Sequence, residues 1–154
     1  MDVDRLKSDL KRYEGSVKNR SGRHVVYDDA DGKAIKPGKV CRGYPTVGYG
    51  RNLAGNGLSE DEAVFLLSND IDRVAEQMDR RINWWRELSA TRQSALLNMA
   101  FNLGISGLLG FPKMLGALKR GDYTTAASES LDSDWARQVG RRRSMGIADM
   151  LRYG

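Results

Sequence analysis

Apolar residues recur at helical spacing near the start of the chain and again over most of its second half. A first helix, capped by Asp2 or Asp4, ends near Tyr13, just before a glycine that favours a helix stop. A second helical pattern covers residues 59–80. Residues 15–58, between the two, show no long helical period and are rich in glycine, lysine and β-branched residues. The pattern therefore predicts two helices separated by extended chain and turns.

The segment between these helices contains three stretches that are typical of short strands and tight turns. Residues 24–27 are mostly β-branched or aromatic and predict a strand. Residues 34–40 predict extended chain around a Pro-Gly turn. Residues 44–52 predict a strand that ends in a tight turn, where Gly48 and Gly50 permit positive φ angles. We expect these stretches to form a small antiparallel sheet.

Residues that start or stop helices mark the helix ends of the second half. Ser59 and Glu62 have the spacing of a capping box. A strongly apolar helix ends at Gly104, and Pro112 suits the first turn of the next helix. A last helix covers residues 141–153. These signals predict that the rest of the chain is all helical.

The combined pattern predicts an α+β protein that is mainly helical and forms one domain over residues 1–154. A lobe of residues 15–58 holds the small antiparallel sheet. A long connecting helix, residues 59–80, joins it to an all-helical lobe, residues 81–154. We expect the N-terminal helix, residues 2–14, to pack on that helical lobe.

The composition, 40% hydrophobic and 29% charged residues, is ordinary for a globular chain. Cys41 is the only cysteine, so no disulfide forms within the chain. His24 is the only histidine, and a zinc site is not expected. The first residues lack the apolar core of a secretory signal, and no run approaches the roughly 20 apolar residues of a spanning helix. We therefore expect neither a signal peptide nor a transmembrane segment.

The net charge of +5 suits several polyanionic partners and excludes none of them. Nucleic acid, anionic lipid and bacterial wall polymers all carry negative charge. A nucleic-acid partner is not expected, because no recognised motif and no interleaved aromatic residues accompany the basic residues. The densest basic run, residues 141–143, is either a solvated face, a source of one arginine that pairs with Glu14, or a site for an anionic ligand.

Three residues around the predicted sheet suit hydrolysis of a glycosidic bond. Glu14 ends the first helix, Asp29 lies in the turn of residues 27–32, and Thr46 belongs to the predicted strand of residues 44–52. In such a reaction one carboxyl group protonates the leaving oxygen while another activates water. The negative end of the helix dipole disfavours the charged form of a carboxylate at the position of Glu14. The alternative interpretation of Glu14 is a solvated glutamate at a helix end.

Other reactive or aromatic side chains have a structural interpretation. Cys41 is expected to be a structural thiol, because only one distant histidine could activate it as a nucleophile. The three tryptophans are expected in the core and not as platforms for sugar rings; they are Trp84, Trp85 and Trp135.

Several short motifs occur in a specific order along nearly the whole chain. They are Tyr13-Glu14-Gly15, residues 27–32, Pro45 to Gly50, Gly57 to Ala63, Arg92 to Gly104, Gly107 to Phe111, and Trp135 with Gly140-Arg141-Arg142. Each motif is weak by itself. In this order they resemble the phage-type lysozymes, the muramidases of glycoside hydrolase family twenty-four. The resemblance implies a lysozyme-like fold, in which a small sheet lobe is joined by a long helix to a helical lobe.

The resemblance also implies roles for the candidate residues. Glu14 would be the general acid, Asp29 would orient or activate water, and Thr46 would help to position that water. The sugar cleft would be lined by Asp31, Asn102 and the backbone near Phe101, and Arg142 would be the arginine near Glu14. The bond attacked would be the β-1,4 bond between N-acetylmuramic acid and N-acetylglucosamine in peptidoglycan. The described members include inverting enzymes, and the resemblance implies neither a metal nor an organic cofactor.

The chain departs from the pattern of this family in three places. The segment between Glu14 and Asp29 is longer than usual by six residues, and a second insertion covers about residues 33–44. Many members carry cysteine at the aspartate position, so Cys41 is a rival of Asp29 for that role. The histidine that often follows the glycine turn is Arg51 here, and its charge partner would have to be rebuilt.

Two alternatives to a hydrolytic lysozyme are a lytic transglycosylase acting on the same bond and an inactive wall-binding or virion module. We expect a monomer that acts on peptidoglycan glycan strands. We also expect it in the host cytoplasm before release to the wall, with help from a holin-type membrane permeabiliser, or else as part of a virion.

Overall fold

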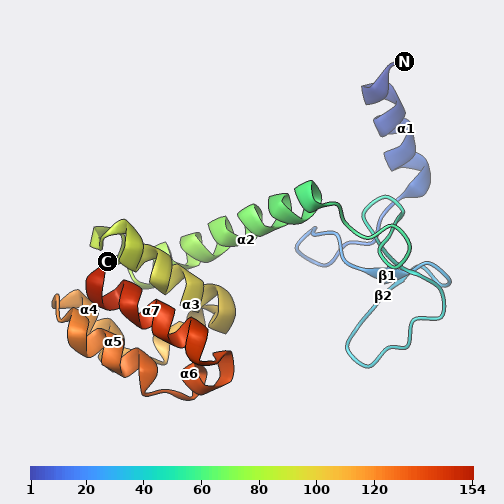
Figure 1. Ribbon diagram of the computed structural model, residues 1–154. Helices are drawn as coiled ribbons and strands as arrows, with labels where there is room; N and C mark the ends of the chain where they lie inside the picture. The colour runs from blue at the N-terminus through green and yellow to red at the C-terminus, as the bar shows by residue number, and fades with distance from the viewer. The chain divides into compact units, whose positions relative to one another are not determined.

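The computed structural model describes all residues, 1–154, and contains seven α-helices, one short 3₁₀ helix and a four-stranded antiparallel sheet (Figure 1). The predicted α+β class with a mainly helical chain is therefore confirmed. Contacts within the chain divide it into two compact units, Met1–Ala63 and Val64–Gly154. The sheet lies entirely in the first unit.

The first unit begins with helix α1 (Val3–Glu14), which the carboxylate of Asp2 caps by accepting a hydrogen bond from the Arg5 amide. The four strands follow in the order β2-β1-β3-β4 across the sheet. Their bounds are Tyr27–Asp28 for β1, Lys33–Ala34 for β2, Pro45–Val47 for β3 and Arg51–Asn52 for β4. In this register, Tyr27 lies opposite Ala34 on one side and Thr46 on the other.

The strand predicted at residues 24–27 is displaced. Regular pairing begins only at Tyr27, whereas His24 forms an isolated bridge with Lys18. The Val25 amide donates to the carbonyl of Val17, so the chain before Tyr27 folds back on itself as a hairpin. The predicted glycine turn is confirmed, because Gly48 and Gly50 have φ angles of 63° and 90° and connect β3 to β4.

Helix α2 (Glu60–Arg81) begins with the predicted capping box. The Glu62 amide donates to Oγ of Ser59 over 3.2 Å, and the Ser59 amide donates to Oε2 of Glu62 over 2.9 Å. The first residues of α2 belong to the first unit and the rest to the second. Only Met78 of this helix is fully buried.

The second unit is all helical, as predicted. After α2 it contains the 3₁₀ helix η1 (Trp85–Glu87), α3 (Ala90–Leu109), α4 (Pro112–Lys119), α5 (Tyr123–Leu131), α6 (Asp134–Val139) and α7 (Arg141–Tyr153). Helix α7 packs against α3, α5 and α6, and α4 packs against α5 (Figure 1). Trp85 and Trp135 are almost completely buried among these helices, which confirms their predicted place in the core.

Helix α3 changes direction where the sequence predicted its end. Gly104 has φ 73° and ψ 162°, a conformation that interrupts the helix, and helical residues then continue to Leu109. No single helix of the chain is both long enough and apolar enough to span a membrane, whereas α3 and α4 together, bent by 101°, meet that test of length and composition. The predicted packing of residues 2–14 on the helical lobe stays a prediction.

Candidate active site

Glu14 is the last residue of α1, and its exposed carboxylate lies against the glycine turn. A Cβ atom placed on Gly50 would lie 3.5 Å from Oε2 of Glu14. Gly50 also has a φ angle of 90°, which side chains other than glycine rarely adopt. The turn between β3 and β4 therefore needs a glycine at this point for its own conformation, and it carries that glycine next to the predicted acid.

Asp29 and Thr46 are joined through the backbone of Tyr44. Oδ1 of Asp29 accepts a hydrogen bond of 2.6 Å from the Tyr44 amide. The hydroxyl of Thr46 donates to the Tyr44 carbonyl over 3.1 Å, and the Asp29 amide donates to the same carbonyl over 3.2 Å. A Cβ at Gly43 would overlap Oδ1 of Asp29, so only glycine leaves room for this arrangement. The structure thus brings together two of the three predicted catalytic residues.

Asp28 is the residue that sequence analysis missed. Its carboxylate is 1% exposed and accepts three backbone amides, from Arg42 at 2.8 Å, Gly43 at 3.0 Å and Ala30 at 3.1 Å. The Arg42 amide, followed by the other two amides and the charge of Lys39, outweighs burial and lowers the pKa of Asp28 from 3.8 to about 2. Asp28 therefore stays ionised and holds the loop before β3 against β1. Its place in the turn of residues 27–32 was the one signal that could have found it.

Asp31 is already engaged within the first unit. Both of its carboxylate oxygens accept from Nζ of Lys39, at 3.0 and 3.1 Å, and Oδ1 also accepts from the Lys33 amide at 2.9 Å. The Lys33 amide is the largest cause that lowers the pKa of Asp31, followed by Lys39. The side chain is exposed, so the sugar contact that the resemblance implies would have to share the carboxylate with Lys39.

Cys41 lies near the same aspartates but has a different chemical state. Its thiol is half-buried and donates to the Gly43 carbonyl over 3.4 Å. Burial is the main cause that raises the pKa of Cys41, and the negative charges of Asp28 and Asp29 raise it further. The thiol therefore remains protonated, which disfavours a role as base or nucleophile.

Arg51 forms an ion pair with Glu62 at the start of α2. Its guanidinium binds both carboxylate oxygens of Glu62, with a distance of 3.1 Å from Nη1 to Oε2, and donates to the Gly57 carbonyl over 3.2 Å. The Ser59 amide is the largest cause that lowers the pKa of Glu62, and Arg51 adds to it. Arg51, which stands where the family often has histidine, thus forms its charge pair with Glu62 within the first unit.

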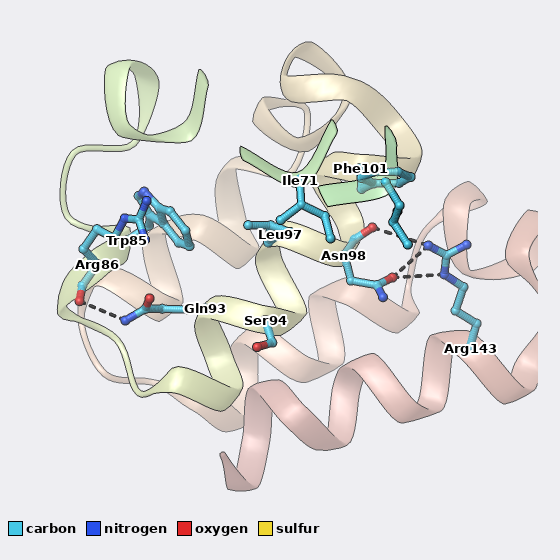
Figure 2. Close-up of a pocket in the computed structure, with 10 residues that line it drawn as sticks. Ile71, Trp85, Arg86, Gln93, Ser94, Leu97, Asn98, Phe101 and Arg143 are labelled. Atoms are coloured by element: carbon cyan, nitrogen blue, oxygen red, sulfur yellow. Dashed lines mark hydrogen bonds between the residues drawn. The ribbon is translucent and has the colours of Figure 1, made fainter. Parts of the chain in front are cut away.

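The sugar-binding residues predicted in the second unit come from α3. Phe101 is 41% exposed and lines a pocket of about 460 Å³ together with Ile71, Trp85 and Leu97 (Figure 2). The next residue, Asn102, accepts a hydrogen bond of 2.9 Å from Nε1 of buried Trp135 through its amide oxygen. Asn102 therefore fixes a core tryptophan, a role that sequence analysis did not predict.

The arginines of residues 141–143 have different surroundings. Arg143 donates to Oδ1 of Asn98 at 2.8 and 3.1 Å, beside Phe101 (Figure 2). Arg142 is exposed and lines a groove with Val139 and Ile147. Its predicted proximity to Glu14 stays a prediction.

The predicted site residues fall into two groups, one in each unit. Glu14, Asp29, Asp31 and Thr46 belong to the first unit, and Phe101, Asn102 and Arg142 belong to the second. No group of three or more histidine, cysteine, aspartate or glutamate side chains is arranged to hold a metal ion. The first group offers three carboxylates and one hydroxyl, and the carboxylate of Glu14 lies beside the glycine turn.

Comparison with known proteins gives the class of this fold. Residues 28–149 match the family described as phage lysozyme, and the chain belongs to this family. The match includes Asp29, Thr46, Phe101 and Arg142, whereas Glu14 precedes it.

One curated relative is the pre-baseplate central spike protein Gp5 of Enterobacteria phage T4. It is 32% identical over 142 residues, which cover 74% of this chain and 25% of Gp5. The chain thus spans about a quarter of the length of this relative.

Proposed function

We propose that this protein is a lysozyme that hydrolyses the β-1,4 bond between N-acetylmuramic acid and N-acetylglucosamine in peptidoglycan. The observation that carries the proposal is that Asp29 and Thr46 bind the backbone of one residue, Asp29 through the Tyr44 amide and Thr46 through the Tyr44 carbonyl. Family membership supports the substrate class, because the matched range contains both residues.

The hydrogen bonds to Tyr44 determine which atoms of Asp29 and Thr46 remain available to a water molecule. Oδ1 of Asp29 is held by the Tyr44 amide, so Oδ2 is the oxygen that accepts a proton from water. The Thr46 hydroxyl uses its only proton on the Tyr44 carbonyl, so its oxygen lone pairs accept a hydrogen bond from the same water. Asp29 then acts as the general base and Thr46 as the residue that positions the nucleophile.

Glu14 completes the reaction as the general acid. Its carboxyl group protonates the leaving glycosidic oxygen while the activated water attacks the anomeric carbon. A water held by one carboxylate, with the other acting as acid, corresponds to inversion at that carbon. Asp31, Phe101, Asn102 and Arg142 are the residues proposed for contacts with the sugar chain.

The test is release of reducing sugar from purified peptidoglycan, with mass analysis of the products. Wild type should give hydrolytic muramic-acid ends, and Glu14→Gln should lose about 10²–10⁴-fold in rate while keeping the fold. Glu76→Gln, an exposed glutamate on α2, is the matched control and should retain activity. Thr46→Val should be impaired, and Thr46→Ser should recover activity because it restores the hydroxyl.

Other products would redirect the proposal. Anhydro-sugar ends from wild type would show a lytic transglycosylase, since that reaction adds no water. A folded wild type that sediments with the wall but releases no sugar would show an inactive wall-binding module.

We also propose that the protein acts as part of a virion, because its relative is named as a spike protein of a phage pre-baseplate. Mass spectrometry of purified virions should then detect the chain in a constant ratio to structural proteins. Its absence from virions, with lysis that depends on a membrane permeabiliser, would instead support release from the cytoplasm with a holin-type partner.

A further inference from the structure

The chain between Glu14 and β1 forms an ordered hairpin, residues 17–25, which we call the basic hairpin. Lys18 and His24 are paired as an isolated bridge, and the Val25 amide donates to the Val17 carbonyl over 3.0 Å. At the tip, Oδ1 of Asn19 accepts from the amide of Ser21 at 3.0 Å and from its hydroxyl at 2.8 Å. These bonds fix the conformation of the tip.

The basic hairpin carries positive charge that nothing in its neighbourhood neutralises. Lys18, Arg20 and Arg23 are all exposed, and their side chains form no ion pair or hydrogen bond. The sequence from Gly15 to Tyr27 contains no acidic residue. Three unpaired cations on one short ordered loop form a surface suited to anionic groups.

No carboxylate forms an ion pair with these cations. Asp28 is buried and accepts three backbone amides, and Asp31 is paired with Lys39. The charge of the basic hairpin is therefore directed to solvent and to whatever binds there.

The position of the basic hairpin relates it to the proposed reaction. It lies between Glu14 and Asp29 along the chain, so each of its ends is within a few residues of a predicted catalytic residue. Its base is also held from the side, because the His24 and Tyr49 rings form a T-shaped pair with centroids 5.2 Å apart. Tyr49 directly precedes Gly50, the glycine beside the Glu14 carboxylate.

We propose that the basic hairpin binds carboxylate groups of the peptide stems that branch from the glycan strand next to the bond being cleaved. Lysine and arginine side chains bind carboxylates through charge-assisted hydrogen bonds. The position of the basic hairpin between Glu14 and Asp29 along the chain favours anions close to the scissile bond over phosphate groups of a distant polymer or of a membrane. This inference rests on the proposed function and adds a determinant of substrate specificity to it.

The test compares two triple variants with equal loss of charge. The first carries Lys18→Gln, Arg20→Gln and Arg23→Gln. The control carries Arg81→Gln, Lys119→Gln and Arg120→Gln, three exposed cations of the second unit. Binding is measured by sedimentation with peptidoglycan free of attached phosphate polymers, either intact or stripped of its peptides by an amidase. The Glu14→Gln background prevents turnover during the measurement.

The hairpin variant should bind intact peptidoglycan about tenfold more weakly at low salt, and high salt should abolish the difference. The control should bind like the parent protein. Neither variant should differ from the parent on glycan without peptides. In the active protein, the same substitutions should raise KM on intact peptidoglycan and leave kcat unchanged.

Equal weakening by both triple variants, or equal weakening on stripped glycan, would overturn the inference. Loss of binding only to vesicles of anionic lipid or to phosphate-bearing wall would also overturn it and assign the hairpin to phosphate. The sedimentation measurement needs no catalysis. An inactive wild type would therefore refute the proposed function, while the binding data would still show whether the basic hairpin binds peptide stems.

Discussion

The carboxylate of Asp29 accepts a hydrogen bond of 2.6 Å from the backbone amide of Tyr44, fifteen residues further along the chain. The carbonyl of the same residue accepts the Thr46 hydroxyl. Asp29 is thereby fixed through one oxygen, while the other remains available to water. This relationship distinguishes Asp29 from its rival Cys41, whose thiol is half-buried and protonated.

Replacing Asp29 by asparagine should remove the base and keep the shape of the side chain. We expect Asp29→Asn to lower the rate of reducing-sugar release by about 10²-fold or more. Cys41→Ala should retain activity close to that of wild type, because burial raises the pKa of the thiol and leaves little thiolate. The reverse result, with an active Asp29→Asn and an inactive Cys41→Ala, would transfer the catalytic role to Cys41.

Asp28 should make the stability of the first unit depend on pH in the acidic range. The backbone amides, that of Arg42 first, lower the pKa of Asp28 from 3.8 to about 2 in the folded chain. Its stabilising contribution is therefore complete above pH 3.8 and is lost as the pH falls toward 2. Urea unfolding, followed by the amide NMR signals of Arg42 and Gly43 at several pH values, should show this loss.

The variant Asp28→Asn should be less stable than wild type at neutral pH and should lose less stability on acidification. Asp9→Asn, an exposed carboxylate on α1, is the control and should keep the wild-type pH profile in this range. An unchanged profile in Asp28→Asn would show that other carboxylates cause the acid sensitivity.

The capping hydrogen bond and the ion pair at the start of α2 should contribute to stability with different dependence on salt. Ser59→Ala removes the hydroxyl that accepts the Glu62 amide and should lower the free energy of unfolding by about 1 kcal/mol at any salt concentration. Arg51→His removes the bidentate ion pair with Glu62, and its smaller effect should shrink in high salt. Thermal unfolding at low and high salt checks both statements. An effect of Arg51→His that is independent of salt would contradict the electrostatic explanation.

Asn102 should matter for stability through Trp135. Asn102→Ala leaves the indole N–H of a buried tryptophan without an acceptor and should lower the free energy of unfolding by about 1–3 kcal/mol. Asn102→Asp keeps an acceptor oxygen and should cost less. Urea unfolding followed by tryptophan fluorescence measures both values. A stability of Asn102→Ala equal to that of wild type would show that water or another group replaces the contact.

Local sequence patterns predict the helices and most of their limits. The capping box of Ser59 and Glu62, the break at Gly104 and the last helix at residues 141–153 all lie where local patterns placed them. These features depend on residues that are neighbours along the chain, so periodicity and capping chemistry report them directly. The class of the fold and the burial of Trp85 and Trp135 follow from the same apolar stripes.

Tertiary structure alone decided the contacts between residues that are distant in sequence. The amides that Asp28 binds lie up to fifteen residues away, and the partner of Arg51 lies eleven residues away. A hydrogen bond from a side chain to a distant backbone amide leaves no periodic signal, because any residue supplies that amide. The strand predicted at residues 24–27 is displaced for the same reason. His24 pairs with Lys18, and this contact forms only when the chain folds back as a hairpin. The sequence thus named Glu14, Asp29 and Thr46, whereas the folded backbone at Tyr44 and Gly50 determined what their side chains contact.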